Sequence, residues 1–254
     1  MNGACDGRPA WKMRFPLLVV LIVFLLPWSS SAQVPSIVES STLQASAHSW
    51  KRVLRNQSPS SLVAYMAGCN PKLDLTTTQD ALLNGGPYIG TGQTTEASVG
   101  NPSICETGIR AAIFSDGHAE GDREFAAELF AERRGAYQAL GDTIKLLASV
   151  YTQHVPAAEI TDKLEAERKA NLRKGTHESG GYNFVLIDIS NFLKDPGVVW
   201  RFPPEYQGQR QQLPSIEDVM NTNGLSHDEA RVFLLNKRLQ VWKSLLQNNL
   251  QPRQ

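Results

Sequence analysis

Apolar residues recur at intervals of three and four positions along several stretches of the chain, which is the spacing of one face of an amphipathic helix. The clearest stretch is 122–151, where the repeating positions are Phe125, Leu129, Tyr137, Leu140, Ile144, Leu147 and Tyr151. The last such stretch starts at Ser226 and Glu229, which have the spacing of a capping box. Besides the helix at 122–151, the pattern predicts helices at 37–54, 59–68, 156–174, 182–193, 214–221 and 226–249.

The segment 182–193 fits either a helix or a buried strand. Its β-branched residues Val185, Ile187 and Ile189 favour a strand. The positions of Val185, Ile189 and Phe192, by contrast, fit one face of a helix. We interpret this segment as a helix.

Small residues form a line along the 122–151 helix, at Ala127, Ala131, Gly135 and Ala139. Such a line lets the backbone of a second helix come close. The next helix in the sequence is 157–174. We predict that it packs on this line as the second half of an αα-hairpin.

Strand signals are sparse by comparison. Alternating apolar positions, typical of a strand, occur in 104–114, at Ile109, Ala111 and Ile113. We therefore expect at most a minor β element. The chain has 254 residues, and residues 33–254 remain when its N-terminal segment 1–32 is set aside. This length suits one domain. The predicted fold is mainly α: an irregular helical bundle in a single domain.

The N-terminal segment 1–32 has the features of a secretory signal peptide. Two basic residues precede an apolar run at 15–28, and small residues follow at Ser30 and Ala32. The run is too short to cross about 30 Å of hydrocarbon as a helix, which argues against the alternative of an uncleaved anchor. We expect cleavage after Ala32, export to the periplasm or the extracellular space, and no stable membrane insertion afterwards.

Two of the three cysteines remain after removal of the signal peptide, because Cys5 lies within it. In an oxidising compartment, the simplest pairing is a disulfide between Cys69 and Cys105. This bond would close a long loop, 69–105, that is rich in Asn, Pro and Gly turn formers. Within it, Asn84-Gly85 is a hairpin signal. We predict an irregular, disulfide-closed loop.

Candidate metal ligands are concentrated in the segment 116–122. Asp116, His118 and Glu120 occupy alternate positions before a glycine, as in the first half of a calcium-binding loop, and Asp122 follows. However, a histidine replaces the usual third ligand, and the twelfth position lacks a carboxylate. We favour a turn in which Asp122 caps the next helix. A divalent cation is the alternative.

Two further segments carry candidate functional residues. Ser179 lies between His177 and a pair of glycines, but no G-x-S-x-G motif is present, and a linker between helices accounts for this composition. Trp200, Phe202 and Tyr206 lie among prolines. We expect them to cover the helical core, with an interaction surface as the alternative.

The balance of charges argues against nucleic acid as a partner. The 25 Lys and Arg residues balance 25 Asp and Glu residues, whereas nucleic-acid-binding proteins carry a basic excess. We predict no cofactor other than the alternative divalent cation. The expected function is that of an exported, soluble protein with a non-catalytic binding, scaffold or envelope-associated role, whose partner is a protein or an envelope component. The alternative is a metal-dependent hydrolase that uses residues 116–122.

Overall fold

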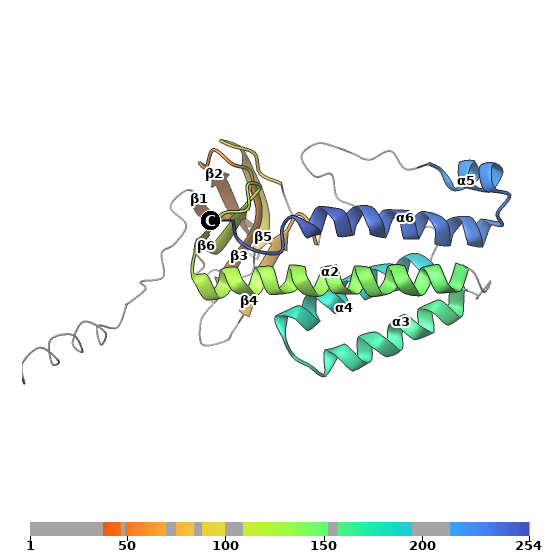
Figure 1. Ribbon diagram of the computed structural model, residues 1–254. Coiled ribbons are helices and arrows are strands. Elements are labelled where there is room, and N and C mark those ends of the chain that lie inside the picture. The colour runs from red at the N-terminus through yellow and green to blue at the C-terminus, as the bar shows by residue number, and fades with distance from the viewer. Residues whose placement is uncertain are drawn as a thin grey trace, which may run out of the picture. The chain divides into compact units, whose positions relative to one another are not determined.

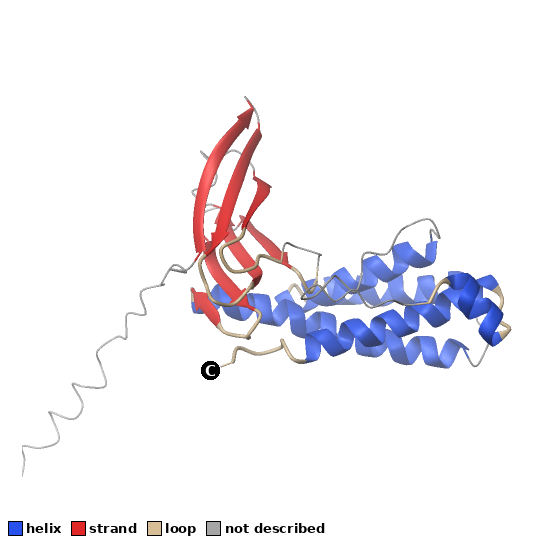
Figure 2. Ribbon diagram, turned by 90° about the horizontal axis from the view of Figure 1, so that it is seen from above, coloured by secondary structure: helices blue, strands red, loops and turns tan. Residues whose placement is uncertain are grey.

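The fold combines sheets and helices (Figures 1 and 2). The computed structural model describes residues 38–46, 49–69, 75–83, 88–99, 109–151, 157–194 and 214–253. Strands dominate the described chain before residue 122, and helices dominate it afterwards. The prediction of a helical bundle is therefore confirmed for the second half of the chain, whereas the prediction of at most a minor β element is wrong.

Seven described strands form two antiparallel sheets. The first sheet has the order β1-β2-β5 and consists of β1 (Val38–Ser46), β2 (Ser49–Asn56) and β5 (Thr94–Val99). The second has the order β4-β3-β6-β7 and consists of β4 (Leu75–Asp80), β3 (Leu62–Cys69), β6 (Ile109–Phe114) and β7 (Ala119–Gly121). Side chains of β2, β3 and β6 share one cluster with Ile89, which lies outside the strands. We call this cluster the inter-sheet core: Leu54, Leu62, Tyr65, Ala67, Ile89, Ile109, Ala112 and Phe114.

Helices were predicted at 37–54 and 59–68, and both predictions are wrong. The first segment is the β1–β2 hairpin, in which Val38 pairs with Asn56. The second is β3, which is buried on both faces: one contributes to the inter-sheet core, and the other packs on a helix through residues such as Met66. A strand buried on both faces has a nearly continuous apolar run, and such a run also fits helical spacing.

The irregular loop predicted between the two cysteines is also wrong in part. It contains β4 and β5, each of which pairs with an earlier strand. The structure does not support the disulfide-closed loop: Cys69 ends β3, and Cys105 lies outside the described residues. The hairpin signal Asn84-Gly85 and the signal peptide 1–32 lie outside them as well. The strand predicted within 104–114 is confirmed as β6.

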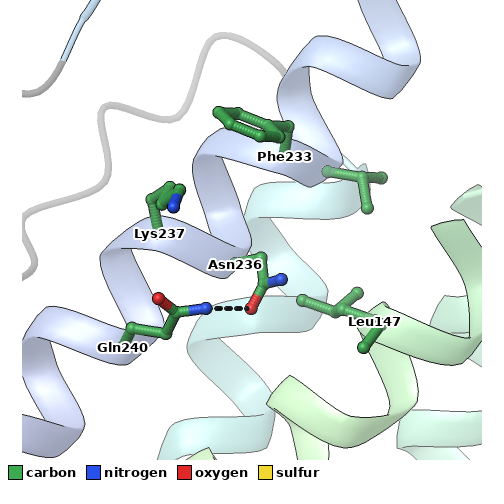
Figure 3. A pocket seen from close by; sticks show the side chains of 7 residues that line it. Leu147, Phe233, Asn236, Lys237 and Gln240 are labelled. Atoms are coloured by element: carbon green, nitrogen blue, oxygen red, sulfur yellow. Dashed lines mark hydrogen bonds between the residues drawn. The ribbon is translucent and has the colours of Figure 1, made fainter.

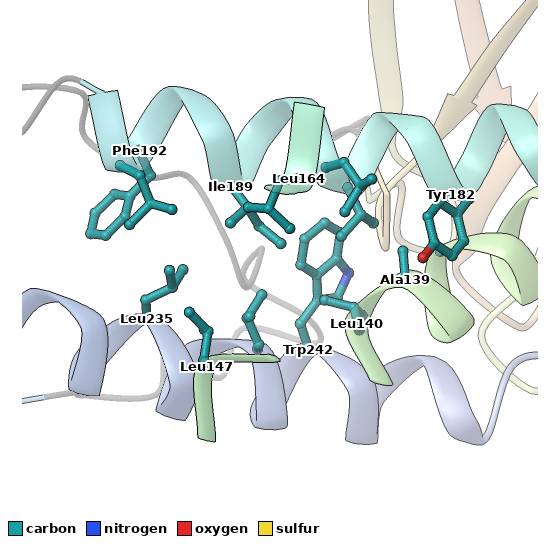
Figure 4. Packing of buried hydrophobic residues seen from close by; sticks show 14 of the residues in the cluster. Ala139, Leu140, Leu147, Leu164, Tyr182, Ile189, Phe192, Leu235 and Trp242 are labelled. Carbon is teal, nitrogen blue, oxygen red and sulfur yellow. The ribbon is translucent and has the colours of Figure 1, made fainter. Parts of the chain in front are cut away.

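The predicted helices after residue 122 are confirmed. They are α2 (Arg123–Tyr151), α3 (Ala157–Leu172), α4 (His177–Lys194), α5 (Ile216–Asn223) and α6 (His227–Gln247). The capping box of Ser226 and Glu229 is present at the start of α6. In Figure 4, Ile189 and Phe192 of α4 point toward Leu235 and Trp242 of α6, which form part of the largest hydrophobic cluster. None of the described helices combines the length and apolar character needed to span a membrane.

Gly135, in the line of small residues on α2, packs against α4 and not α3, whereas Ala127 at the start of the line is exposed. A Cβ atom built on Gly135 would lie 1.8 Å from the carbonyl oxygen of Glu178, and one built on Gly181 would lie 1.9 Å from that of Glu132. Farther along both helices, Tyr182 donates a hydrogen bond to Asp142. Side-chain contacts along the two helices advance together, from Glu128–His177 through Arg134–Glu178 to Asp142–Tyr182, so α2 and α4 run in the same direction. The predicted αα-hairpin of α2 and α3 is wrong, because α3 packs mainly on α4.

Candidate functional site

The predicted metal-binding segment forms the turn between β6 and β7 and the start of α2. The two ring nitrogens of His118 face different carboxylates: Nδ1 lies 2.5 Å from Asp116 Oδ1, and Nε2 lies 3.9 Å from Glu120 Oε1. Asp122 is separate, because its Oδ1 accepts a hydrogen bond from the backbone N–H of Glu124 in the first turn of α2. The structure thus brings three of the four predicted residues together and uses the fourth as the helix cap.

Hydrogen bonds within the turn account for the position of Asp116. Its carboxylate accepts bonds from the Ser60 hydroxyl at 2.6 Å and from the backbone N–H of His118 at 3.1 Å. Burial alone would raise the pKa of Asp116, but these bonds and the neighbouring imidazole hold it below its usual value. The His118 ring also stacks on Phe114, with centroids 4.3 Å apart. Over the described ranges, no group of three or more His, Cys, Asp or Glu residues is arranged to hold a metal ion.

The Ser179 segment is a helix start. The backbone N–H of Thr176 donates to Ser179 Oγ, the backbone N–H of Ser179 donates to Thr176 Oγ1, and the Ser179 hydroxyl donates to the Thr176 carbonyl. This reciprocal pattern caps α4. The Ser179 hydroxyl is therefore engaged in the cap. The prediction that this segment is a linker between helices is wrong, because it forms the first turn of α4.

A buried ion pair joins the second sheet to the helices. Arg133 of α2 and Asp80 of β4 both have side chains with no solvent exposure. Arg133 donates from Nε to Asp80 Oδ2 at 2.7 Å and from Nη2 to Asp80 Oδ1 at 3.1 Å. Asp80 also accepts a bond from the backbone N–H of Leu82. Because each charge has its counterion and further hydrogen bonds, this pair is a structural link rather than a free binding group.

A shallow groove lies between α2 and α6 (Figure 3). Leu147 and Phe233 contribute apolar surface, the Lys237 ammonium lies 5.6 Å from the centre of the Phe233 ring, and Gln240 donates to Asn236. Its volume is about 240 Å³. Small-molecule pockets usually occupy about 300–1,000 Å³, so the groove is smaller than a typical ligand site.

Arg52, which the sequence analysis did not single out, is the most unusual polar group of the sheets. It lies on β2 two positions from Leu54, so its side chain is on the face of the inter-sheet core. The residue is only 3% exposed, its Nε has no hydrogen-bond partner, and none of the ion pairs among the described residues includes it. Burial lowers the pKa of Arg52, but an arginine keeps its charge in a protein.

The other buried polar side chains of the sheet region are satisfied. The Asn56 amide donates to the carbonyls of Ser60 and Ile89 and accepts from the backbone N–H of Ser58. Ser58 in turn accepts from the backbone N–H of Ser60. Tyr65 is 2% exposed on the inter-sheet core and interacts electrostatically with Arg52. We define Arg52 and Tyr65 as the candidate site.

One signal in the sequence could have revealed Arg52. In β2, alternate positions are buried, and Arg52 precedes Leu54 and Asn56 in that series. A charged residue at an inward position of a strand is a marked exception to the alternation of buried and exposed residues. The helix prediction for 37–54 hid this exception, because helical spacing places Arg52 on a different face from Leu54.

The aromatic residues Trp200, Phe202 and Tyr206 lie outside the described residues, and the prediction that they cover the core or form an interaction surface remains a prediction. Comparison of the whole chain with models of protein families, with curated proteins and with solved structures finds no match.

Proposed function

We propose that this protein is a non-catalytic binding protein whose ligand places an anionic group against Arg52. The observation that carries the proposal is Arg52, a residue only 3% exposed whose Nε has no hydrogen-bond partner and which forms no ion pair among the described residues. Removing an ion from water costs several kcal/mol unless a partner compensates. A bound anion would provide that compensation.

The chemistry of the two residues favours an oxyanion. A guanidinium matches a carboxylate, sulfate or phosphate group through parallel N–H donors. Tyr65 adds a hydroxyl on the same core, and burial raises its pKa although Arg52 opposes that rise. Tyr65 therefore stays protonated near neutral pH and can donate a hydrogen bond. With export expected from the sequence, the ligand would be a protein or an envelope component that carries such a group.

Thermal unfolding with and without oxyanions tests the proposal. Wild type, Arg52→Met and Arg55→Gln would be melted in phosphate, sulfate or acetate against chloride at equal ionic strength. Arg55 is the matched control, because it lies on the same strand but is exposed. We expect at least one oxyanion to raise the melting temperature of wild type and Arg55→Gln but not that of Arg52→Met. Comparison among the variants removes the general stabilisation that sulfate and phosphate give any protein.

The same variants supply a second criterion. Without ligand, Arg52→Met replaces an uncompensated charge with an apolar side chain of similar length, so it should leave the protein as stable as wild type or more stable. Equal oxyanion effects on all three proteins would contradict the proposal. A large loss of stability in ligand-free Arg52→Met would also contradict it, since that result means that Arg52 is paired within the protein.

A further inference from the structure

We propose that the crossing of α2 and α4 is a pH-sensitive clasp, which closes firmly in mild acid and loosens as the medium becomes neutral to alkaline. The residues responsible are Glu128, Glu132 and His177, which we call the crossing cluster. This proposal is independent of the Arg52 site, because it rests on a different region and different groups.

The geometry of the crossing cluster connects the two helices through one imidazole. Glu128 and Glu132 lie on successive turns of α2, and His177 is the first residue of α4. His177 Nε2 lies 3.4 Å from Glu128 Oε1, and its Nδ1 lies 3.9 Å from Glu132 Oε1. The His177 side chain is 49% exposed, so protons from the solvent reach the cluster.

The charges around Glu132 are mostly negative. Asp80 faces it from β4 and Glu128 from its own helix, whereas His177 faces it from α4. The adjacent Arg133 is engaged by Asp80 in two hydrogen bonds. Three carboxylates thus lie near one another, and Arg133 pairs with only one of them. Protonation of Glu132 reduces this excess of negative charge.

Burial is the largest cause that raises the pKa of Glu132, to about 7, with the charges of Asp80 and Glu128 adding to it and His177 opposing it. Between pH 4.5 and about 7, the folded protein therefore keeps a proton on Glu132, whereas the unfolded chain, in which the pKa of this residue is 4.5, has released it. The contribution of this proton to the free energy of unfolding is complete below pH 4.5, falls as the pH rises toward 7, and is lost above pH 7.

The tight contact of the helices concentrates this effect at the crossing. Gly135 and Gly181 bring the two backbones together with no room for a Cβ atom. Packed interiors deform little, so an ionised Glu132, whose burial α4 contributes to, returns to water by opening of the first turn of α4 rather than by a small adjustment. The His177 contacts lie in that turn, and opening would release them.

Hydrogen exchange of backbone amides measured at several pH values between 5 and 8 tests the clasp. After correction for intrinsic exchange rates, we expect protection in 177–182 of wild type to fall by on the order of tenfold or more across this range, since one pKa unit corresponds to a factor of ten. Glu132→Gln should remove most of this dependence. Glu178→Gln is the matched control, because Glu178 is in the same turn and pairs with exposed Arg134.

Three results would overturn the proposal. One is an unchanged pH dependence in Glu132→Gln, and another is an equal loss in Glu178→Gln. The third is a wild type whose melting temperature changes with pH while protection in 177–182 stays constant relative to the rest of α4, because Glu132 would then titrate without opening the crossing. His177→Gln gives an additional check: it removes the imidazole that lies near both glutamates and should reduce protection in 177–182.

Discussion

In the helices, several neutral groups are buried without a hydrogen-bond partner among the described residues, including Thr143 Oγ1, Asn183 Oδ1 and Ser190 Oγ. In the described part of the sheets, Asn56 and Ser58 are fully bonded, and the Nε of one charged residue, Arg52, has no hydrogen-bond partner. The number of unsatisfied groups is therefore larger in the helices, but the cost of leaving a cation unpaired is greater than that of a hydroxyl or an amide.

Asp188 shows why the kind of group matters. Its Oδ2 on α4 also lacks a hydrogen-bond partner, and burial raises its pKa to about 6. A carboxyl can lose its charge in this way, whereas an arginine cannot. The comparison teaches that an unpaired group indicates a ligand most strongly when the protein has no internal means of neutralising it.

The largest predicted effect tests whether a paired charge in the sheets behaves differently from the unpaired one. Asp80→Asn should lower the free energy of unfolding by about 3–5 kcal/mol, because Arg133 would be left as an uncompensated buried cation. Urea unfolding measures the change. Lys51→Gln is the control, since the Lys51–Glu96 pair is about half exposed and should contribute less than about 1 kcal/mol. Similar losses of unfolding free energy in both variants would contradict the prediction that the buried ion pair matters more than the exposed one.

The next effect concerns the closest approach in the helical region. Gly135→Ala should destabilise the protein by about 1–3 kcal/mol, because the added methyl group meets the Glu178 backbone at 1.8 Å. Gly180→Ala is the matched control: no atom lies within 4 Å of its added Cβ, so helix propensity should stabilise it by roughly 0.5–1 kcal/mol. Denaturant unfolding gives both values, and a stable Gly135→Ala protein would disprove the close contact.

The smallest effect tests the start of α6. Ser226 accepts a hydrogen bond from the backbone N–H of Glu229 at 3.4 Å, and Glu229 bonds back to the backbone N–H of Ser226 at 2.9 Å. Ser226→Ala should cost about 1 kcal/mol, whereas Ser226→Gly should cost a few tenths of a kcal/mol. Thermal unfolding compares the two variants. Equal losses would mean that the hydroxyl contributes little to the cap.

The success of sequence reasoning differed between the two regions for a physical reason. Each helix after residue 122 has an apolar face with polar residues elsewhere, so the spacing of residues such as Leu140 and Leu147 was sufficient to find it. In β3, the run Leu62–Ala67 is buried throughout, so no alternation marks the strand. The hairpin of β1 and β2 was missed although its strands are adjacent in sequence, because Leu43, Trp50 and Leu54 recur at a spacing that also fits one face of a helix.

For the candidate sites, local pattern identified only groups that are close in sequence. The contacts of His118 with Asp116 and Glu120 were predictable from their alternate positions. The crossing cluster joins Glu132 to His177, 45 positions later, and Arg52 meets Tyr65 only because β2 and β3 belong to different sheets. The fold creates these arrangements, so the sequence alone did not predict them.

The hydrogen bond from Trp242 Nε1 to the carbonyl of Leu82 has a consequence for how fast the protein folds. It is 2.6 Å long and joins residues 160 positions apart, and Arg133 reaches the Asn249 carbonyl across 116 positions. Contacts of such sequence separation require closure of long loops before they give any stability, and they slow folding. We expect individual helices to form early and transiently, with the docking of α6 against the end of β4 as the slow step that commits the chain to its native state.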